Sequence, residues 1–599
     1  MPLSPPLLLS FRASTLAAQQ LFVILVPGIF AACTPIQSEI AISPGEEFVL
    51  GGNQPGSYSV ELSNSGTVAV RVSAEGGEPG DPKELATLDP GQELSHRFLD
   101  GEAAVLANLG ASEASLAAKI YTARSLNMGY RKLDAGYEPK PLTAEEASED
   151  LRILRRTIEE IHPGYGRFTD AGAMDKLFEG LEAASEDGST DMDLYRDIAR
   201  LLTEMRCDHT KAELPEAIQA YRQDSPSYLP FTFRLFGERM LVDRPGASGL
   251  ARGDEIVQIN GRPLSKIVRD IAPFVPVDGY TDATKRVEME HSSEFLGDAV
   301  DHFWPFLYGW PEEWRIEARP AAKGKAIRVA LEPVTYLEWL ELAASGSERY
   351  VNFPDTVEFR MLDETTGYLS IGTFVNYRKP VVPSTVFDPL FDELAKAKAE
   401  RLIVDLRDCG GGSDDVPAAL MGYLSDTIVP TAKRSPWVRT FDVGDLRPYL
   451  SSWDDSIFQM PAALFRDLGN GFFELQQPLA QPRPAPQRSN RFLGDLTVLC
   501  SPANASGATT MIALLQEHYD ARIVGEPTGG SAEGPTAGVM FFLKLPNSGI
   551  VVRVPAMRSW VNVSNPKPGF GVMPDVLIEP SLEDWLNERD VVLDAARRD

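Results

Sequence analysis

The residue whose type and setting most clearly indicate chemistry is Ser506. It lies in LTVLCSPANASGATTMIALLQEHYDARIVGEPTGG, residues 496–530, which reads as strand, small-residue turn, helix, second strand and glycine turn. A strand-to-helix turn holds a hydroxyl rigidly beside the free backbone N–H groups of the helix start. Because serine alone is a weak nucleophile, the rest of the chain must supply a base. The alternative interpretation of Ser506 is a helix cap.

Three consecutive glycines, Gly410 to Gly412, follow the short apolar strand 402–404. Glycine lets the backbone come close to a ligand and point its N–H groups into one cavity. A plain turn before the helix that follows Ser413 is the alternative. We expect Asp405 and Arg407, at the start of this loop, to brace it.

Histidine is the side chain best suited to act as a base near neutral pH. Six histidines are scattered along the chain, and His209 follows the apolar stripe of a helix predicted from about Asp191. A surface or capping histidine is the alternative there. We expect His162 to be structural. We also expect His518 to be solvated or packed, because it lies about 18 Å along a helix from Ser506.

The composition sets the class of protein. The chain has 599 residues, 43% of them hydrophobic and 24% charged, which predicts a globular protein of about three to five domains. The net charge of −29 argues against a general nucleic-acid binder. The four cysteines form no CxxC pair and no HExxH is present, so neither motif predicts a metal site. We expect Cys409 and Cys500 to be small apolar fillers.

The N-terminal residues 1–33 look like a targeting segment. Arg12 precedes the apolar run 21–32, which is too short to span a bilayer comfortably, and Cys33 follows it. The ending Ala-Ala-Cys resembles a bacterial lipobox, in which the cysteine is lipidated. We therefore predict a protein of the bacterial cell envelope, on the periplasmic side, lipid-anchored through Cys33. An ordinary cleaved signal peptide and a cytoplasmic protein with an apolar N-terminus are the alternatives.

The remaining patterns predict a multidomain α/β protein. Alternation of apolar and polar residues over 34–125 indicates an N-terminal β-sandwich-like domain without chemistry of its own. A helical domain spans 143–225. Its first helix is predicted to begin with a capping box, Thr143 to Glu146, and to end at His162, before a proline.

Two further domains complete the prediction. GDEIVQING, within residues 226–345, resembles the second half of a PDZ-like domain, which binds peptide ends by strand addition. No carboxylate-binding loop precedes it, so a purely structural module is the alternative. Alternating strands and helices over 350–599 predict a sheet covered by helices. The long irregular insertion 426–495 in that region is expected to contact substrate.

Four motifs occur in a characteristic order: IVDLRDCGGG, LTVLCSPANASGATT, ARIVGEPTGG and GVMPDVLIEP. With the upstream EDLRILRRTIEEIHPGY, MRCDHT and GDEIVQING, they resemble the tail-specific (C-terminal processing) serine peptidases, in the branch related to the tricorn core protease. The resemblance covers roughly residues 143–585. It implies a crotonase-like α/β catalytic core.

The resemblance also implies roles for particular residues. Ser506 would be the nucleophile and His209 the base. Gly410, supported by Gly411, would supply one oxyanion donor, and the N–H of Gly507 the other.

The chain departs from the family pattern at two positions. Ser531 stands where one branch of the family has its catalytic lysine, which excludes a serine–lysine dyad. Pro568 stands where the other branch has the glutamate of its triad. Ser564 or Asn565 could replace that glutamate as a neutral partner, and Asp208 is adjacent to His209, so the third role stays unassigned.

These observations together predict an exported serine endopeptidase that acts on peptides or proteins and needs no metal or organic cofactor. One alternative is an impaired pseudo-peptidase that binds peptides or protein C-termini. The other is a crotonase-type acyl-transfer enzyme, although no coenzyme A site is evident.

Overall fold

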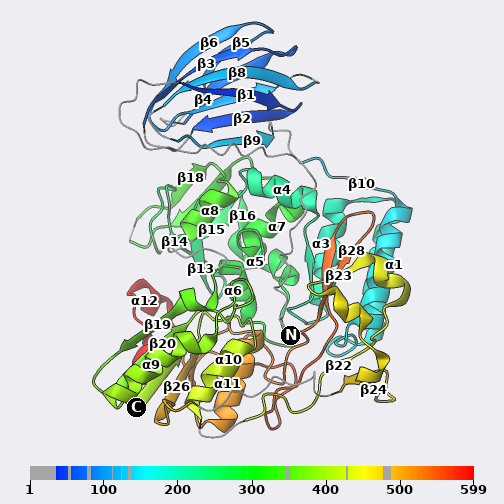
Figure 1. Ribbon diagram of the computed structural model, residues 1–599, viewed down its shortest axis with the longest axis vertical. Coiled ribbons are helices and arrows are strands. Elements are labelled where there is room, and N and C mark those ends of the chain that lie inside the picture. Colours follow the sequence, from blue (N-terminus) through cyan, green and yellow to red (C-terminus); the bar gives the residue numbers. More distant parts are fainter. Residues whose placement is uncertain are drawn as a thin grey trace, which may run out of the picture. The chain divides into compact units, whose positions relative to one another are not determined.

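The computed structural model of the protein consists of two compact units, Met1–Gly136 and Tyr137–Asp599 (Figure 1). The described residues are 35–598 except 52–55, 77–82, 109, 111, 123–124, 133–136, 293, 323, 344–350, 426–428 and 477–487. Cys33 and the targeting segment predicted over 1–33 lie outside them.

The N-terminal unit is built from two antiparallel sheets around one apolar core. The sheet orders are β1-β8-β3-β6 and β5-β4-β7-β2-β9. Tyr58 links the sheets, because its hydroxyl donates to the Leu50 carbonyl at 2.5 Å. The strands are β1 (Ile36–Ile42), β2 (Glu46–Gly51), β3 (Tyr58–Asn64), β4 (Val70–Glu75), β5 (Lys83–Leu88), β6 (Glu93–Phe98), β7 (Ala103–Asn108), β8 (Ala114–Tyr121) and β9 (Met128–Lys132).

The second unit begins with a helical region. Its helices are α1 (Ala144–Ile161), α2 (Ala171–Ala184), α3 (Asp191–Thr203) and α4 (Glu216–Asp224), and the short strands β10 (Pro141–Leu142) and β11 (Ser189–Thr190) pair beside them. The capping box predicted at Thr143 and Glu146 is confirmed, and α1 ends at the predicted place, with His162 as its C-cap. The sequence prediction missed α2, although Asp170 caps its first turn.

A mixed region of strands and helices follows. Its sheet has the order β13-β14-β15-β17-β18, with β16 paired to β15. The predicted tight turn is present, because Asn260 and Gly261 both have positive φ, at 49° and 75°. The elements are β13 (Thr232–Phe236), β14 (Arg239–Arg244), β15 (Glu255–Ile259), β16 (Arg262–Pro263), α5 (Leu264–Ile271), α6 (Thr284–Glu290), α7 (Ala299–Tyr308), β17 (Trp314–Arg319), β18 (Ile327–Leu331) and α8 (Tyr336–Ala343).

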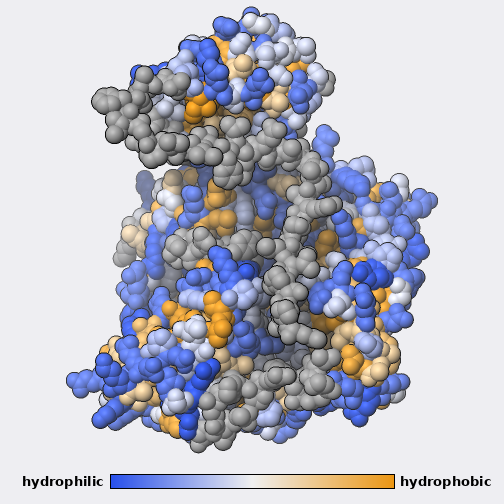
Figure 2. All heavy atoms as spheres, in the orientation of Figure 1, coloured by the Kyte–Doolittle hydropathy of each residue, from blue (hydrophilic) through white to orange (hydrophobic). Residues whose placement is uncertain are grey.

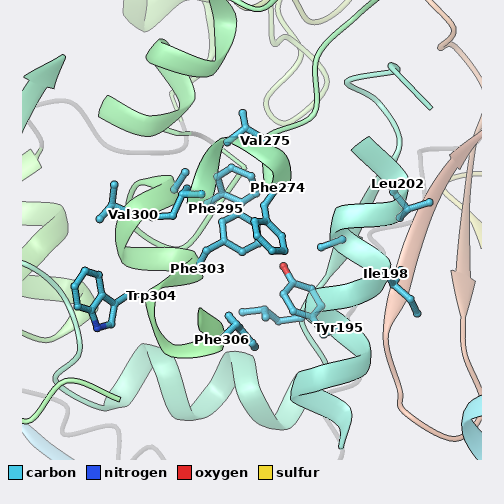
Figure 3. Close-up of a cluster of buried hydrophobic side chains, with 14 of the residues drawn as sticks. Tyr195, Ile198, Leu202, Phe274, Val275, Phe295, Val300, Phe303, Trp304 and Phe306 are labelled. Carbon is cyan, nitrogen blue, oxygen red and sulfur yellow. The ribbon is translucent and has the colours of Figure 1, made fainter. Parts of the chain in front are cut away.

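The helical and mixed regions share one apolar core. Figure 3 shows the buried aromatic side chains where α3 meets α7. The rings of Tyr195 and Phe306 lie 4.9 Å apart, and the buried Tyr195 hydroxyl lies 2.8 Å from His302 Nε2. This shared packing fixes α3, and with it the segment that leads to His209.

The C-terminal region is a sheet covered by helices, as the alternation predicts. The sheet has the order β19-β20-β21-β26-β27-β30, antiparallel only between β19 and β20. The elements are β19 (Val357–Met361), β20 (Thr366–Ile371), α9 (Pro383–Ala397), β21 (Arg401–Asp405), α10 (Asp415–Leu424), β26 (Asp495–Cys500), α11 (Ser506–His518), β27 (Arg522–Gly525), β30 (Val576–Leu577), α12 (Leu582–Leu586) and α13 (Val591–Arg598). Apolar side chains of these strands and of α9, α10 and α11 form a second core.

A small sheet of order β12-β29-β28-β23 joins the helical region to the C-terminal region. Its strands are β12 (Lys211–Glu213), β23 (Leu450–Ser452), β28 (Met540–Lys544) and β29 (Val551–Pro555). The buried Asp150 of α1 strengthens this junction, because its carboxylate accepts hydrogen bonds from the N–H groups of Asn547 and Ser548 in the β28–β29 turn.

The insertion 426–495 is more regular than its sequence predicts. Besides β23, its described part contains a small sheet of β22 (Trp437–Val438), β25 (Phe473–Leu475) and β24 (Phe465–Asp467). The face of the protein drawn in Figure 2 is mainly hydrophilic, with hydrophobic residues in small groups. No helix within the described ranges is long and apolar enough to cross a membrane.

Candidate active site

Ser506 lies at the carboxyl edge of the parallel sheet. β26 ends at Cys500, and the turn that follows leads directly into α11, whose first residue is Ser506. Ser506 has a φ of 45°, which a non-glycine residue adopts only at a cost of about 1–3 kcal/mol, and such strain is typical of functional sites. The helix cap is Ala505, and it makes no side-chain cap bond. Ser506 is therefore not the helix cap that was its alternative interpretation.

The turn before Ser506 is fixed by Asn504, whose side chain is fully buried. Its amide donates to the carbonyls of Leu406 and Cys409, and its Oδ1 accepts from the Ser501 N–H at 2.7 Å. These bonds tie the turn before Ser506 to the loop that follows β21. No described residue forms a hydrogen bond with Ser506 Oγ, which leaves the hydroxyl available.

The glycine loop lies directly against this turn. A Cβ on Gly411 would stand 2.9 Å from the backbone nitrogen of Gly507 and 3.1 Å from Ser506 Cβ. Gly411 has a φ of 105° and Gly412 one of 142°, so both need glycine. Within the described part of the chain, no group accepts a hydrogen bond from the N–H of Gly410 or of Gly507.

Two neighbours of the glycine loop are structural. Burial raises the pKa of the Cys409 thiol to about 12, and the Gly411 N–H lies close to this sulfur, which makes Gly410 the freer donor. The Arg407 guanidinium donates hydrogen bonds to the carboxylates of Asp405 and Asp590, as expected of a residue that braces the glycine loop. Cys500 is also buried with a raised pKa, so both cysteines act as fillers.

His209 is brought to this region by strand pairing. The prediction placed it at a helix end, but α3 ends at Thr203, and His209 lies in a turn closed by the Thr210 N–H and the Cys207 carbonyl. β12 begins two residues later and pairs with β29, so that Lys211 lies opposite Arg553. A strand of three residues has too weak a sequence pattern to be predicted, so the sequence does not indicate that β12 positions His209.

Asp208 contacts the imidazole of His209. The Asp208 Oδ1 and His209 Nδ1 atoms lie 2.5 Å apart, although not in hydrogen-bond geometry. Burial lowers the pKa of His209, but the facing carboxylate of Asp208 outweighs this, so the pKa is raised well above its usual value. Burial likewise raises the pKa of Asp208, and the charge of His209 outweighs it, so that pKa is lowered.

Asp278, from the segment between α5 and α6, adds a second carboxylate. Its Oδ1 accepts a hydrogen bond from the Asp208 N–H at 3.2 Å. Burial and the negative charge of Asp208 raise the pKa of Asp278. Asp278 lies 70 residues from Asp208 and belongs to no motif, so no signal in the sequence could have identified it.

None of the other residues named from the sequence as possible site residues lines the cavity described below. Ser564, Asn565 and Pro568 are exposed and do not line the site cavity. Ser531 is buried, and its hydroxyl has no hydrogen-bond partner among the described residues. His162 is fully buried between the Thr210 hydroxyl and the Gly164 N–H, and burial lowers its pKa to about 3. His518 bonds the Asn562 carbonyl and lies outside the cavity lining.

One cavity of about 2150 Å³ gathers the candidate residues. Its lining includes five residues expected from the sequence, namely Ser506, His209, Gly410, Gly411 and Gly507, together with Asp208. The insertion 426–495 also contributes, through residues that include Trp453 and Leu475. No hydrogen bond joins Ser506 and His209 within the described residues.

Comparison with known proteins gives a family match and several solved structures of similar fold. Residues 365–578 match the model of peptidase family S41. The structure of mature CPAF complexed with lactacystin has a similar fold, with a TM-score of 0.50 and 14% identity over 76% of this chain and 99% of that chain. A comparison with curated proteins found no match.

Two other solved structures resemble the chain more distantly. The photosystem II D1 C-terminal processing protease gives a TM-score of 0.34, with 16% identity over 72% of this chain and 93% of that chain. The tricorn protease gives 0.31, with 14% identity over 82% and 38%. The match over residues 365–578 confirms the resemblance drawn from the motifs: the chain carries a peptidase S41 domain, the domain of the tail-specific (C-terminal processing) proteases, and is a serine-type peptidase.

Proposed function

We propose that the protein is an exported serine endopeptidase whose nucleophile is Ser506 and whose general base is His209. One observation carries the proposal. Ser506 is held at a strained φ of 45° and lines the same cavity as His209, Gly410 and Gly507. Among the described residues, nothing bonds the Ser506 hydroxyl or accepts a hydrogen bond from the Gly410 and Gly507 N–H groups. That arrangement brings together a nucleophile, a base and two donors for an oxyanion.

The reaction would follow the general course of serine peptidases. Ser506 Oγ attacks the peptide carbonyl while His209 takes its proton, and the Gly410 and Gly507 N–H groups hold the developing oxyanion. His209 then passes the proton to the leaving amine, and water hydrolyses the acyl-enzyme. Since Nδ1 faces Asp208, Nε2 is the nitrogen that would face the serine.

Asp208 is the group that we propose in place of the missing triad glutamate. A carboxylate against Nδ1 fixes the tautomer of the imidazole and stabilises its protonated form. Ser506 and His209 share no hydrogen bond within the described residues, and catalytic hydrogen bonds often tighten only when substrate binds.

The substrate would be an extended peptide or protein segment. The cavity of about 2150 Å³ exceeds the roughly 300–1,000 Å³ usual for small-ligand pockets. Residues 226–345 would form a PDZ-like unit beside a crotonase-like core, and Thr232, Phe233 and Arg234 of β13 line the cavity. A strand at that border could pair with an extended substrate.

A fluorophosphonate probe tests the proposal without knowledge of the substrate. We expect the purified protein to be labelled at one serine, and Ser506→Ala to abolish labelling. His209→Ala should slow it strongly, whereas His518→Ala, which changes a histidine outside the cavity, should not. Undiminished labelling of Ser506→Ala would exclude Ser506 as nucleophile. A wild-type protein that binds peptides but is never labelled would favour the pseudo-peptidase.

Export and anchoring are a separate proposal, which rests on the apolar run 21–32 and Cys33. We propose that Cys33 becomes the lipidated N-terminus and holds the peptidase at the periplasmic side of the bacterial cell envelope. Metabolic labelling with a fatty-acid analogue should mark the wild type but not Cys33→Ser. Equal labelling of both proteins would rule out this anchor.

A further inference from the structure

Four side chains with metal-binding atoms converge beside the proposed base. The Cys207 sulfur, one oxygen each of Asp208 and Asp278, and a ring nitrogen of His209 all lie within 4.8 Å of one another. Three of these residues share one turn, and Asp278 reaches them from the segment between α5 and α6. The fold, and not a sequence motif, therefore creates this group.

Several of these atoms are buried without the partners they need. Asp278 is 6% exposed, and its Oδ2 has no hydrogen-bond partner in the described structure. Asp208 Oδ1 and His209 Nδ1 face each other at 2.5 Å but not in hydrogen-bond geometry, and neither has another hydrogen-bond partner among the described residues. Leaving one buried polar atom unpaired costs about 1–3 kcal/mol, so the unpaired Asp278 Oδ2 and the poorly aligned Asp208–His209 contact call for a further partner. A cation satisfies all of them at once.

We propose that Cys207, Asp208, His209 and Asp278 bind one Zn²⁺ ion, and that this ion switches the peptidase off. A thiolate, an imidazole and two carboxylates are a ligand set that suits zinc. Asp208 and His209 line the cavity, so a hydrated ion can reach the site from there.

The geometry requires only small movements. Ligand atoms around a tetrahedral zinc are about 3.3–3.5 Å apart, given bonds of about 2.0–2.3 Å. The 2.5 Å contact between Asp208 and His209 would therefore widen by about 1 Å. The Cys207 thiol would lose its proton to solvent and leave its 3.8 Å contact with the Thr536 carbonyl.

The inhibitory effect rests on the proposed function of His209. When the neutral imidazole binds zinc through Nδ1, its proton must stay on Nε2, the nitrogen assigned to accept the serine proton. The ion would thus block the base and leave Ser506 and the glycine loop unchanged. Metal binding itself does not depend on the peptidase mechanism, so the two parts can be tested separately.

The binding test uses the full chain carrying Ser506→Ala, stripped of metal and titrated with Co²⁺ as a coloured substitute for Zn²⁺. We expect one ion per chain and a thiolate-to-cobalt charge-transfer band. Adding Cys207→Ala should remove that band and weaken Zn²⁺ binding at least about tenfold. Cys500→Ala, which removes a buried thiol of β26, should preserve both. A spectrum without the thiolate band, or equal losses in the two variants, would overturn the site.

A second variant keeps the binding test decisive if Cys207→Ala does not fold. Asp278→Asn keeps the shape of the side chain, and we expect it to weaken Zn²⁺ binding at least about tenfold whether or not Cys207→Ala folds. Full affinity in a folded Asp278→Asn protein would also overturn the site.

The activity test compares the fluorophosphonate labelling rate of each variant with and without Zn²⁺. We expect zinc to slow labelling at least tenfold in the wild type and in Cys500→Ala. The ratio should stay near one in Cys207→Ala at the same zinc concentration. If Co²⁺ binds as expected but zinc leaves labelling unchanged, the switch is refuted. If no variant is ever labelled, the proposed function fails, and the cobalt titration still decides the metal site.

Discussion

Replacing Gly411 with alanine would put one methyl group where the proposed oxyanion forms. Its Cβ would lie 2.9 Å from the Gly507 nitrogen and 3.1 Å from Ser506 Cβ, so it would cover the Gly507 N–H. The neighbouring Gly410 provides a matched control. Its Cβ would meet no other residue closer than 3.9 Å, and its φ is not in the left-handed region.

The size of the effect follows from these distances. Losing one oxyanion donor costs about 10²–10³-fold in rate, or about 2.7–4 kcal/mol. The φ of 105° at Gly411 adds about 1–3 kcal/mol of backbone strain, which lowers the stability of the fold and not the rate. Gly410→Ala retains its N–H, and we expect its rate to stay within about threefold of the wild type.

The assay is the second-order rate constant of fluorophosphonate labelling, measured with a melting curve for each protein. We expect Gly411→Ala to melt at a lower temperature but remain folded at 25 °C, and to be labelled about 10²–10³-fold more slowly. A folded Gly411→Ala protein that is labelled as fast as Gly410→Ala would refute the placement of the oxyanion beside Gly507.

Three further predictions concern the protonation of His209, its neighbour Asp208 and the buried His162. The proposed base, His209, would act in its neutral form and its pKa is raised, so the metal-free wild type should be labelled faster as pH rises through a value above about 6.5. Asp208→Asn should move that midpoint to lower pH and slow labelling about 10²–10⁴-fold at the plateau. A pH–rate profile measured with a chelator present would detect both effects, and an unmoved midpoint would contradict the role of Asp208. His162 is buried in its neutral form with a pKa of about 3, so the stability it contributes is present above about pH 6.5 and is lost as pH falls towards 3. Between pH 6 and 4, the free energy of unfolding measured with urea should therefore fall by about 1.4 kcal/mol per pH unit more in the wild type than in His162→Gln. If the free energies of the two proteins change in parallel with pH, His162 is not buried in the neutral form.

Local signals in the sequence were sufficient to locate the turn at Ser506 and the helix that begins there. Thr143 and Glu146 form the predicted capping box because both partners lie within one turn of chain. Ser506 is likewise placed by a strand, a turn of small residues and a helix that are contiguous in sequence. Helix α2 escaped prediction because its 14 residues bury only Met174 and Phe178, too few for a clear apolar stripe.

The partners of His209 could not be predicted in the same way. Adjacent side chains usually point apart, but the turn closed between Cys207 and Thr210 brings Asp208 against the ring of His209. Arg206, with a φ of 50°, begins this departure from helical geometry. Asp278 arrives from another part of the fold, and a single sequence does not reveal such long-range contacts.

The position of His209, the proposed base, depends on charge balance across the three-residue strand β12. Lys211 of β12 lies directly opposite Arg553 of β29, and two like charges so placed would oppose the pairing. Glu294 resolves this conflict, because its carboxylate lies 3.7 Å from Lys211 Nζ and 2.5 Å from Arg553 Nη1. The positive charge of Lys211 outweighs the effect of burial, and the pKa of Glu294 is lowered to about 2. The carboxylate therefore stays ionised at any pH at which a histidine can act as a base. His209, two residues before this strand, is thus held near the S41 domain by a strand pairing that Glu294 supports at any pH at which a histidine can act as a base. Protonation of His209 would add to this support, because the charge of His209 also lowers the pKa of Glu294.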